Sequence, residues 1–135
     1  MTRVMFDTNI LVSAILNSRS TPAQAFRKAA EPPCQALICE QTLEELRRVF
    51  NRKFPHKIQS LDRFILIMLS IVEIVPMPLV KYVSEDYIRD ADDRPILRAA
   101  IKANADILIS GDKDFLDSGV MNPRILTAAQ FLDIA

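Results

Sequence analysis

The chain has 135 residues, half of them hydrophobic, which is enough for one domain with one substantial core. Its 17 lysines and arginines balance its 17 aspartates and glutamates, so the molecule as a whole has no strong field that attracts nucleic acid or an anionic membrane. Any binding of a polyanion must therefore come from a local basic patch or a metal ion. We expect a single domain over residues 1–135 and no membrane span, because the most apolar stretch, residues 64–72, is far shorter than the ~20 residues that cross a bilayer.

The hydrophobic pattern predicts strands that alternate with helices. We expect strands at residues 4–6, 36–39, 73–75, 106–110 and 124–126. We expect helices at residues 10–16, from 21 to the prolines at 32 and 33, from 42 to about 54, and at 60–72, 95–103 and 127–134. The pattern assigns no element to residues 80–87. This order is typical of an α/β fold with a central parallel sheet between two layers of helices, a three-layer α/β/α sandwich.

The cysteines indicate a reducing compartment. Cys34 and Cys39 flank or lie within one predicted strand, form no CxxC pair, and have a single histidine in the chain to help them hold zinc. We interpret them as reduced, buried small hydrophobic residues of a cytoplasmic protein.

Four acidic residues stand where predicted strands or loops give way to helices. They are Asp7 in FDTN, Glu45 in TLEELRRV, Asp93 in DADDRPIL and Asp112 in SGDKDF. In parallel sheets, ligands bind beyond the carboxyl ends of the strands, so these side chains are expected to face one crevice. Carboxylate oxygens without histidine or thiolate select Mg²⁺ or Mn²⁺ over zinc.

Helical phase separates Glu45 from its neighbour Glu44. Glu45 borders the predicted apolar stripe of its helix, whereas Glu44 points outward beside Arg47 and Arg48. The simplest role for Glu44 is a surface ion pair with one of these arginines. The motif alone leaves open which glutamate belongs to the site.

Other acids also have structural interpretations. Asp93 lies on the apolar face of the helix that contains Pro95, but either it or Asp92 is equally suited to cap that helix. Asp114 is suited to cap the short turn at residues 115–116.

The combination of FDTN, the EL pair of the third helix, DxxDRPIL and SGDKDF resembles the PIN-domain nucleases, and is most similar to the toxins of bacterial toxin-antitoxin pairs. The resemblance covers nearly the whole chain in order and spacing. It implies a PIN-like α/β/α sandwich and a metal-dependent endoribonuclease with an antitoxin partner. By motif position, the family's acids would fall on Asp7, Glu45, Asp93 and Asp112, which would be both catalytic and metal-binding.

The resemblance also implies a supporting set of polar residues. Asn9 and Asp114 correspond to second-tier members of the family's site, and Ser110 retains a hydroxyl where the family often has threonine. Asp90 is able to share the place of Asp93, because DxxD supplies two acids three residues apart. We expect these side chains to orient the metal-binding acids by hydrogen bonds.

These observations favour hydrolysis of RNA phosphodiester bonds with one or two Mg²⁺ or Mn²⁺ ions that activate water. The alternative is a module of the same fold that binds RNA or a protein without cleaving it. A signalling receiver domain fits poorly, since Asp7 is followed by Thr8 and Asn9 instead of a second acid.

Two further segments concern partners. The densest basic cluster consists of Arg47, Arg48, Arg52, Lys53, His56 and Lys57, for which a solvated helix end is a simpler interpretation than an RNA contact. Residues 64–69 are apolar on every side of a predicted helix, which exceeds what one core face requires. We expect part of this run to be buried in a homodimer or against an antitoxin, with burial wholly inside the monomer as an equal alternative.

Overall fold

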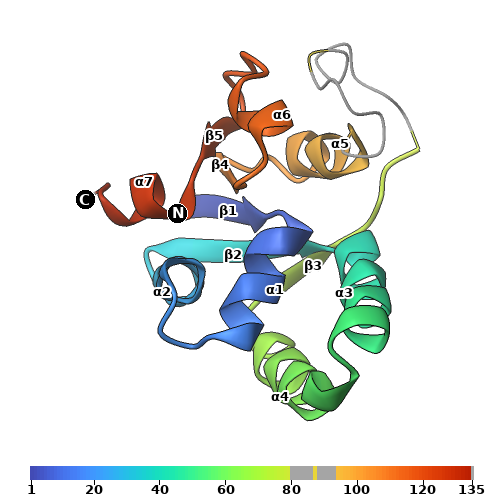
Figure 1. Cartoon of the computed structure of the whole chain (residues 1–135). Coiled ribbons are helices and arrows are strands. Elements are labelled where there is room, and N and C mark those ends of the chain that lie inside the picture. The colour runs from blue at the N-terminus through green and yellow to red at the C-terminus, as the bar shows by residue number, and fades with distance from the viewer. Residues whose placement is uncertain (80–86, 88–93, 135) are drawn as a thin grey trace.

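The central element is a parallel sheet of five strands. The structure, a computed structural model, describes residues 1–79, 87 and 94–134 (Figure 1). The strands are β1 (Thr2–Phe6), β2 (Cys34–Cys39), β3 (Glu73–Val75), β4 (Ile107–Ile109) and β5 (Arg124–Leu126). Their order in the sheet is β3-β2-β1-β4-β5, and every neighbouring pair is parallel. The predicted α/β class and parallel sheet are confirmed.

Helices cover both faces of this sheet. They are α1 (Thr8–Leu16), α2 (Thr21–Ala29), α3 (Glu40–Lys53), α4 (Ile58–Met68), α5 (Arg94–Lys102), α6 (Lys113–Leu116) and α7 (Ala128–Leu132), with a 3₁₀ turn at Pro55–Lys57. Figure 1 shows α1 to α4 on one side of the sheet and α5 and α6 on the other. Right-handed crossovers explain the change of side, because the chain moves outward from β1 through β2 to β3 and then returns to the opposite flank of β1 at β4.

Alternating side chains of the strands build two separate cores. Val4 and Phe6 of β1 face the core formed with α1, α2, α3, α4 and α7, whereas Met5 between them faces the core formed with α5 and α6. Both faces of β1 are therefore buried, which is why the strand reads as a continuous apolar run.

The end of α4 differs from the predicted end at residue 72. The helix stops at Met68, and a turn follows in which the Ser70 hydroxyl donates to the carbonyl of Ile67 at 2.8 Å. A serine that bonds the local backbone, followed by the β-branched Ile71 and Val72, weakens the helical alternative. Of the unassigned connector at residues 80–87, only Tyr87 lies within the described residues.

The cysteines stand at the two ends of β2 and are both free. Burial raises the pKa of the Cys39 thiol, which keeps it protonated and unreactive. None of the helices in the described part of the chain is long and apolar enough to cross a bilayer.

Candidate active site

The strand order changes direction between β1 and β4, and in open α/β sheets a crevice forms outside the carboxyl ends of the strands at such a switch point. Phe6 of β1 pairs with Ile109 of β4, and the next residue of each strand, Asp7 and Ser110, begins a loop at the same edge. The Asp7 amide continues the ladder by donating to the carbonyl of Ile109 at 3.0 Å. Open α/β sheets bind their ligands at such a switch point.

Asp7 is a buried carboxylate fixed by two donors. The residue is only 8 % exposed. The Thr8 amide donates to Oδ1 at 2.8 Å, so Asp7 also caps the N-terminus of α1, and the Ser110 hydroxyl donates to Oδ2 at 2.9 Å. Each oxygen retains a second lone pair for another ligand.

Glu45 reaches the same site from α3. The Thr8 hydroxyl donates to Oε2 of Glu45 at 2.7 Å, and the side-chain amide of Gln41, one helical turn earlier, donates to Oε1 at 3.3 Å. Thr8 thus connects the two acids, since its amide bonds Asp7 and its hydroxyl bonds Glu45. Glu44 is exposed and points away from this network.

Asp112 approaches from the loop after β4. Its amide donates to the Ser110 hydroxyl at 3.0 Å, so the hydroxyl that holds Asp7 also positions Asp112. The Asp114 amide donates to Oδ1 of Asp112 at 2.9 Å, which makes Asp112 the cap of α6. The prediction that Asp114 caps this turn is therefore wrong: the capping oxygen comes from the residue before the helix.

The three acids act on one another electrostatically. Burial is the main cause that raises the pKa of Asp7, and the negative charges of Asp112 and Glu45 raise it further. The bonds from Ser110 and Thr8 lower this pKa without offsetting the burial. A group of carboxylates that destabilise one another's charged forms favours a cation.

The donor set fits a hard divalent ion. Asp7, Glu45 and Asp112 bring carboxylate oxygens close together at this edge of the sheet, and these are the ligands that Mg²⁺ and Mn²⁺ prefer. The described part of the chain contains no group of three or more His, Cys, Asp or Glu side chains already arranged to hold a metal ion. Two of the predicted acids, Asp90 and Asp93, lie outside the described residues.

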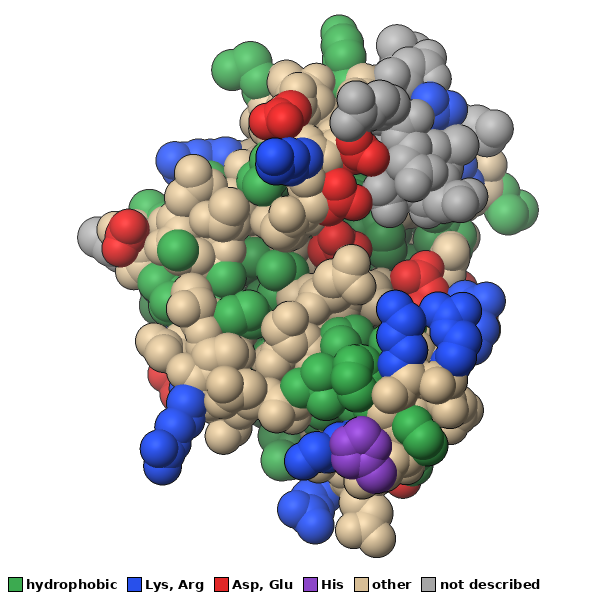
Figure 2. All heavy atoms as spheres, in the orientation of Figure 1, with side chains coloured by type: hydrophobic (Ala, Val, Ile, Leu, Met, Phe, Trp, Pro, Cys, Tyr) green, Lys and Arg blue, Asp and Glu red, His purple; other side chains and the backbone are tan. Residues whose placement is uncertain are grey.

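Two polar contacts in the site were absent from the predicted set. Thr8 and Gln41 hold Glu45, although the sequence signal for each was modest: a hydroxyl next to Asp7, and an amide one helical turn before Glu45. Asn9 of the predicted supporting set lies exposed in the first turn of α1. Figure 2 shows acidic side chains gathered across the middle of this face of the molecule.

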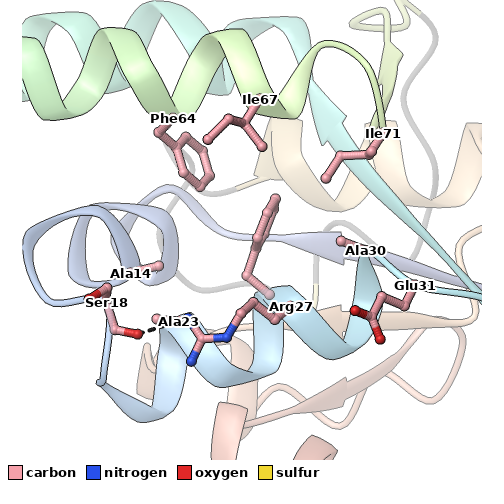
Figure 3. A pocket seen from close by; sticks show the side chains of 10 residues that line it. Ala14, Ser18, Ala23, Arg27, Ala30, Glu31, Phe64, Ile67 and Ile71 are labelled. Atoms are coloured by element: carbon pink, nitrogen blue, oxygen red, sulfur yellow. Dashed lines mark hydrogen bonds between the residues drawn. The ribbon is translucent and has the colours of Figure 1, made fainter.

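A separate apolar groove lies between α1, α2 and α4. It has a volume of about 520 Å³. Figure 3 shows Phe64, Ile67 and Ile71 facing α2 across it, with Arg27 and Glu31 on the α2 side. Leu66 and Leu69 of the same apolar run do not line this groove, and they are 72 % and 56 % exposed. The alternative that the apolar run 64–69 is buried wholly inside the monomer is therefore wrong.

The comparisons with known proteins agree with this architecture. The sequence model of the PIN domain matches residues 3–114, and the chain therefore belongs to the PIN-domain family. One similar structure is VapBC2 from Rickettsia felis bound to a DNA fragment from its promoter, with a TM-score of 0.69, 22 % identity, and coverage of 93 % of this chain and 98 % of that one.

A second similar structure is Mycobacterium tuberculosis VapC20, a toxin that cleaves the sarcin-ricin loop. It has a TM-score of 0.61 and 16 % identity, and covers 86 % of this chain and 95 % of that one. At these identities the two structures establish the fold. No curated protein sequence matches the chain.

Proposed function

We propose that this protein is a metal-dependent endoribonuclease and the toxin of a toxin-antitoxin pair. The observation that carries the proposal is the convergence of Asp7, Glu45 and Asp112 in the crevice between β1 and β4 of a PIN-domain chain. Membership of this family and the likeness to an RNA-cleaving toxin support RNA as the substrate.

In this proposal, Asp7 and Asp112 hold Mg²⁺ or Mn²⁺ together with Asp93. Asp90 is the alternative to Asp93. When bound, the ion lowers the pKa of a coordinated water and neutralises charge on the scissile phosphate. Ser110 keeps the carboxylates of Asp7 and Asp112 in fixed relation, because its hydroxyl bonds one side chain and the backbone of the other.

Glu45 has the geometry of a residue that binds the ion or orients the attacking water. Its two oxygens are held by Thr8 and Gln41, so the carboxylate cannot rotate freely. Asp114 supports Asp112 through its backbone amide, and we assign Asn9 a supporting role from its place in the motif. Precise orientation by such neighbours is what metal ligands require.

The test is cleavage of a labelled single-stranded RNA by purified protein with Mn²⁺, with Mg²⁺, and with EDTA. We expect cleavage with either ion, none in EDTA, and loss of activity in Asp7→Asn. The matched control is Glu44→Gln, which removes one exposed acid adjacent to Glu45. Full activity in EDTA, or equal activity of Asp7→Asn and wild type, would contradict the metal-carboxylate proposal.

A non-cleaving binding module is the rival function. The two functions differ in metal binding, because a scaffold has no need of a cation among its acids. Calorimetric titration with Mn²⁺ separates them: binding that is weakened by Asp7→Asn supports the nuclease, and absence of binding supports the scaffold.

We further propose that an antitoxin covers the apolar groove and the exposed side chains of α4. The groove is apolar, as expected for a surface that receives the apolar face of a partner helix. The likeness to a VapBC assembly supports a partner of that class. The competing occupant is a second copy of this chain.

Light scattering separates these occupants. The purified chain is measured alone at high concentration and with the small DNA-binding protein, if one exists, from the adjacent reading frame. We expect a complex that Ile67→Asp abolishes, whereas Asp62→Asn, an exposed change on the same helix, leaves it intact. A dimer of the chain alone that Ile67→Asp dissociates would assign the groove to self-association instead.

A further inference from the structure

One outer flank of α3 carries both Glu45 and basic side chains. At about 100° per residue, Gln41, Arg48 and Arg52 lie within about 60° of Glu45 around the helix axis. Leu46 and Phe50 are buried on the inner face. The flank that begins with a site acid therefore continues as a basic stripe.

This stripe starts at the candidate active site and runs away from it. Glu45 is fixed to the crevice by its bond from Thr8. At 1.5 Å per residue, Arg48 and Arg52 follow at about 4.5 and 10.5 Å further along the helix. The backbone positions of the two arginines are thus about 6 Å apart along the helix, a spacing suited to side chains that bind neighbouring phosphates of an extended strand.

Both arginines are exposed and available. The ion pairs among the described residues are Arg3 with Glu73 and Arg47 with Asp62, so neither Arg48 nor Arg52 has an acidic partner there. Arg47 lies about 160° around the helix from Glu45, and bonds Asp62 of α4 at 3.4 Å instead of Glu44. The predicted surface pair between Glu44 and a neighbouring arginine is therefore wrong.

Basic side chains stand next to the acids although the chain as a whole is neutral. Figure 2 shows Lys and Arg side chains beside acidic ones over the region of α3. RNA approaching the acidic crevice is repelled by it, so its affinity must come from cations close by. Arginine suits this task, because its planar guanidinium binds phosphate through two parallel hydrogen bonds.

We propose that the outer flank of α3 is the backbone-binding track for single-stranded RNA, with Arg48 and Arg52 each binding one phosphate next to the scissile one. The inference rests on the proposed nuclease function and deepens it by assigning where the strand lies. Because phosphate contacts carry no base information, the track adds affinity and register without sequence preference.

The test compares two double variants that remove equal charge. Arg48→Gln with Arg52→Gln removes the track, whereas Arg19→Gln with Arg63→Gln removes two exposed arginines on other parts of the chain. Binding of a fluorescent 20-nucleotide RNA of mixed sequence is measured by anisotropy in EDTA, where no turnover is expected, from 25 to 200 mM KCl. Circular dichroism melting checks that both variants are folded.

We expect the track variant to bind about tenfold more weakly at low salt, and the slope of log Kd against log salt to fall by about 1.4, since each phosphate contact on a single strand contributes about 0.7. The control should keep the wild-type slope. Equal losses in both variants, or no loss in either, would overturn the track. Mn²⁺-dependent cleavage by the wild type distinguishes failure of the track from failure of the proposed nuclease function. If the wild type cleaves RNA and the track variant binds RNA as tightly as the wild type, the track alone is refuted. If the wild type neither binds nor cleaves RNA, the nuclease function is refuted as well.

Discussion

Replacing Asp7 by asparagine should stabilise the metal-free protein. The wild-type carboxylate is buried, faces the charges of Asp112 and Glu45, and has no cationic partner among the described residues. Replacing a buried ion by a neutral group of the same shape is stabilising by about 1 to 4 kcal/mol where the ion is poorly compensated. The bonds from Ser110 and Thr8 offset part of this gain, because they favour the charged form of Asp7 without cancelling the effect of its burial.

The expected net gain is about 1 to 2 kcal/mol at pH 7 in EDTA, or about 4 to 8 °C in Tm for a domain of this size. Its pH dependence follows from the raised pKa of Asp7. The folded wild type binds more protons than the unfolded chain between the unfolded carboxyl pKa near 3.9 and the higher folded pKa, so this group favours folding more as the pH falls. The advantage of Asp7→Asn should therefore be largest at neutral pH and shrink as the pH falls through this window.

The assay is urea unfolding followed by circular dichroism, in EDTA, at several pH values between 4 and 8. Glu44→Gln is the control, because it removes a carboxylate that is already in water and should change stability little. Added Mn²⁺ should raise the Tm of the wild type more than that of Asp7→Asn. A metal-free Asp7→Asn protein that is less stable than wild type at pH 7, or a difference that does not vary with pH, would refute the reasoning.

Ser110→Ala should destabilise the fold by about 1 to 3 kcal/mol, because it removes the donor to buried Asp7. It should also weaken Mn²⁺ binding, measured by calorimetry, by about 10- to 100-fold. An unchanged Mn²⁺ affinity would contradict the positioning role of Ser110. Thr8→Val should lower RNA cleavage through the loss of its bond to Glu45, and Thr8→Ser should restore the rate; failure of serine to rescue would point to packing instead. Asn104 follows α5 with φ of 57°, so Asn104→Gly should raise the unfolding free energy by up to about 1 kcal/mol in urea titrations, and a loss of stability would show that its side chain matters more than its backbone.

Local sequence patterns predicted most strands and helices close to their observed bounds. Residues 73–75 and 124–126 were predicted as strands and are β3 and β5 with the same bounds. The helix predicted from Thr21-Pro22 has Pro22 in its first turn, although the capping residue is Ser20, one position earlier than the rule placed it. Such features depend on neighbouring residues alone, so a linear reading captures them.

The position of the acids required more than the linear pattern. Asp7 and Asp112 are more than a hundred residues apart, and they meet because β4 pairs with β1 instead of joining the edge at β3. Helical phase favoured Glu45 over Glu44, but the contact that connects Glu45 to the crevice comes from Thr8 on another element. The roles of Asp90 and Asp93 remain predictions from the motif.

Which residues of the apolar run 64–69 are buried also depended on tertiary packing. Periodicity could not decide whether residues 64–69 lie inside the domain, since a helix that is apolar all round fits a core or an interface. In the structure, Leu61 and Met68 fill the core side, and Leu66, Ile67 and Leu69 remain exposed because no other described element covers that side.

The amino-acid sequence by itself determined the kinds of element, their order and the oxygen-rich chemistry of the loops, because hydrophobic period, caps and side-chain type are local properties. Only the tertiary structure decided the strand order, the bonds of Ser110 and Thr8 that tie the acids together, and the side of α4 that is left open. The physical reason is that sheet pairing and burial are set by contacts between segments far apart in the chain, and no local pattern encodes which of them meet.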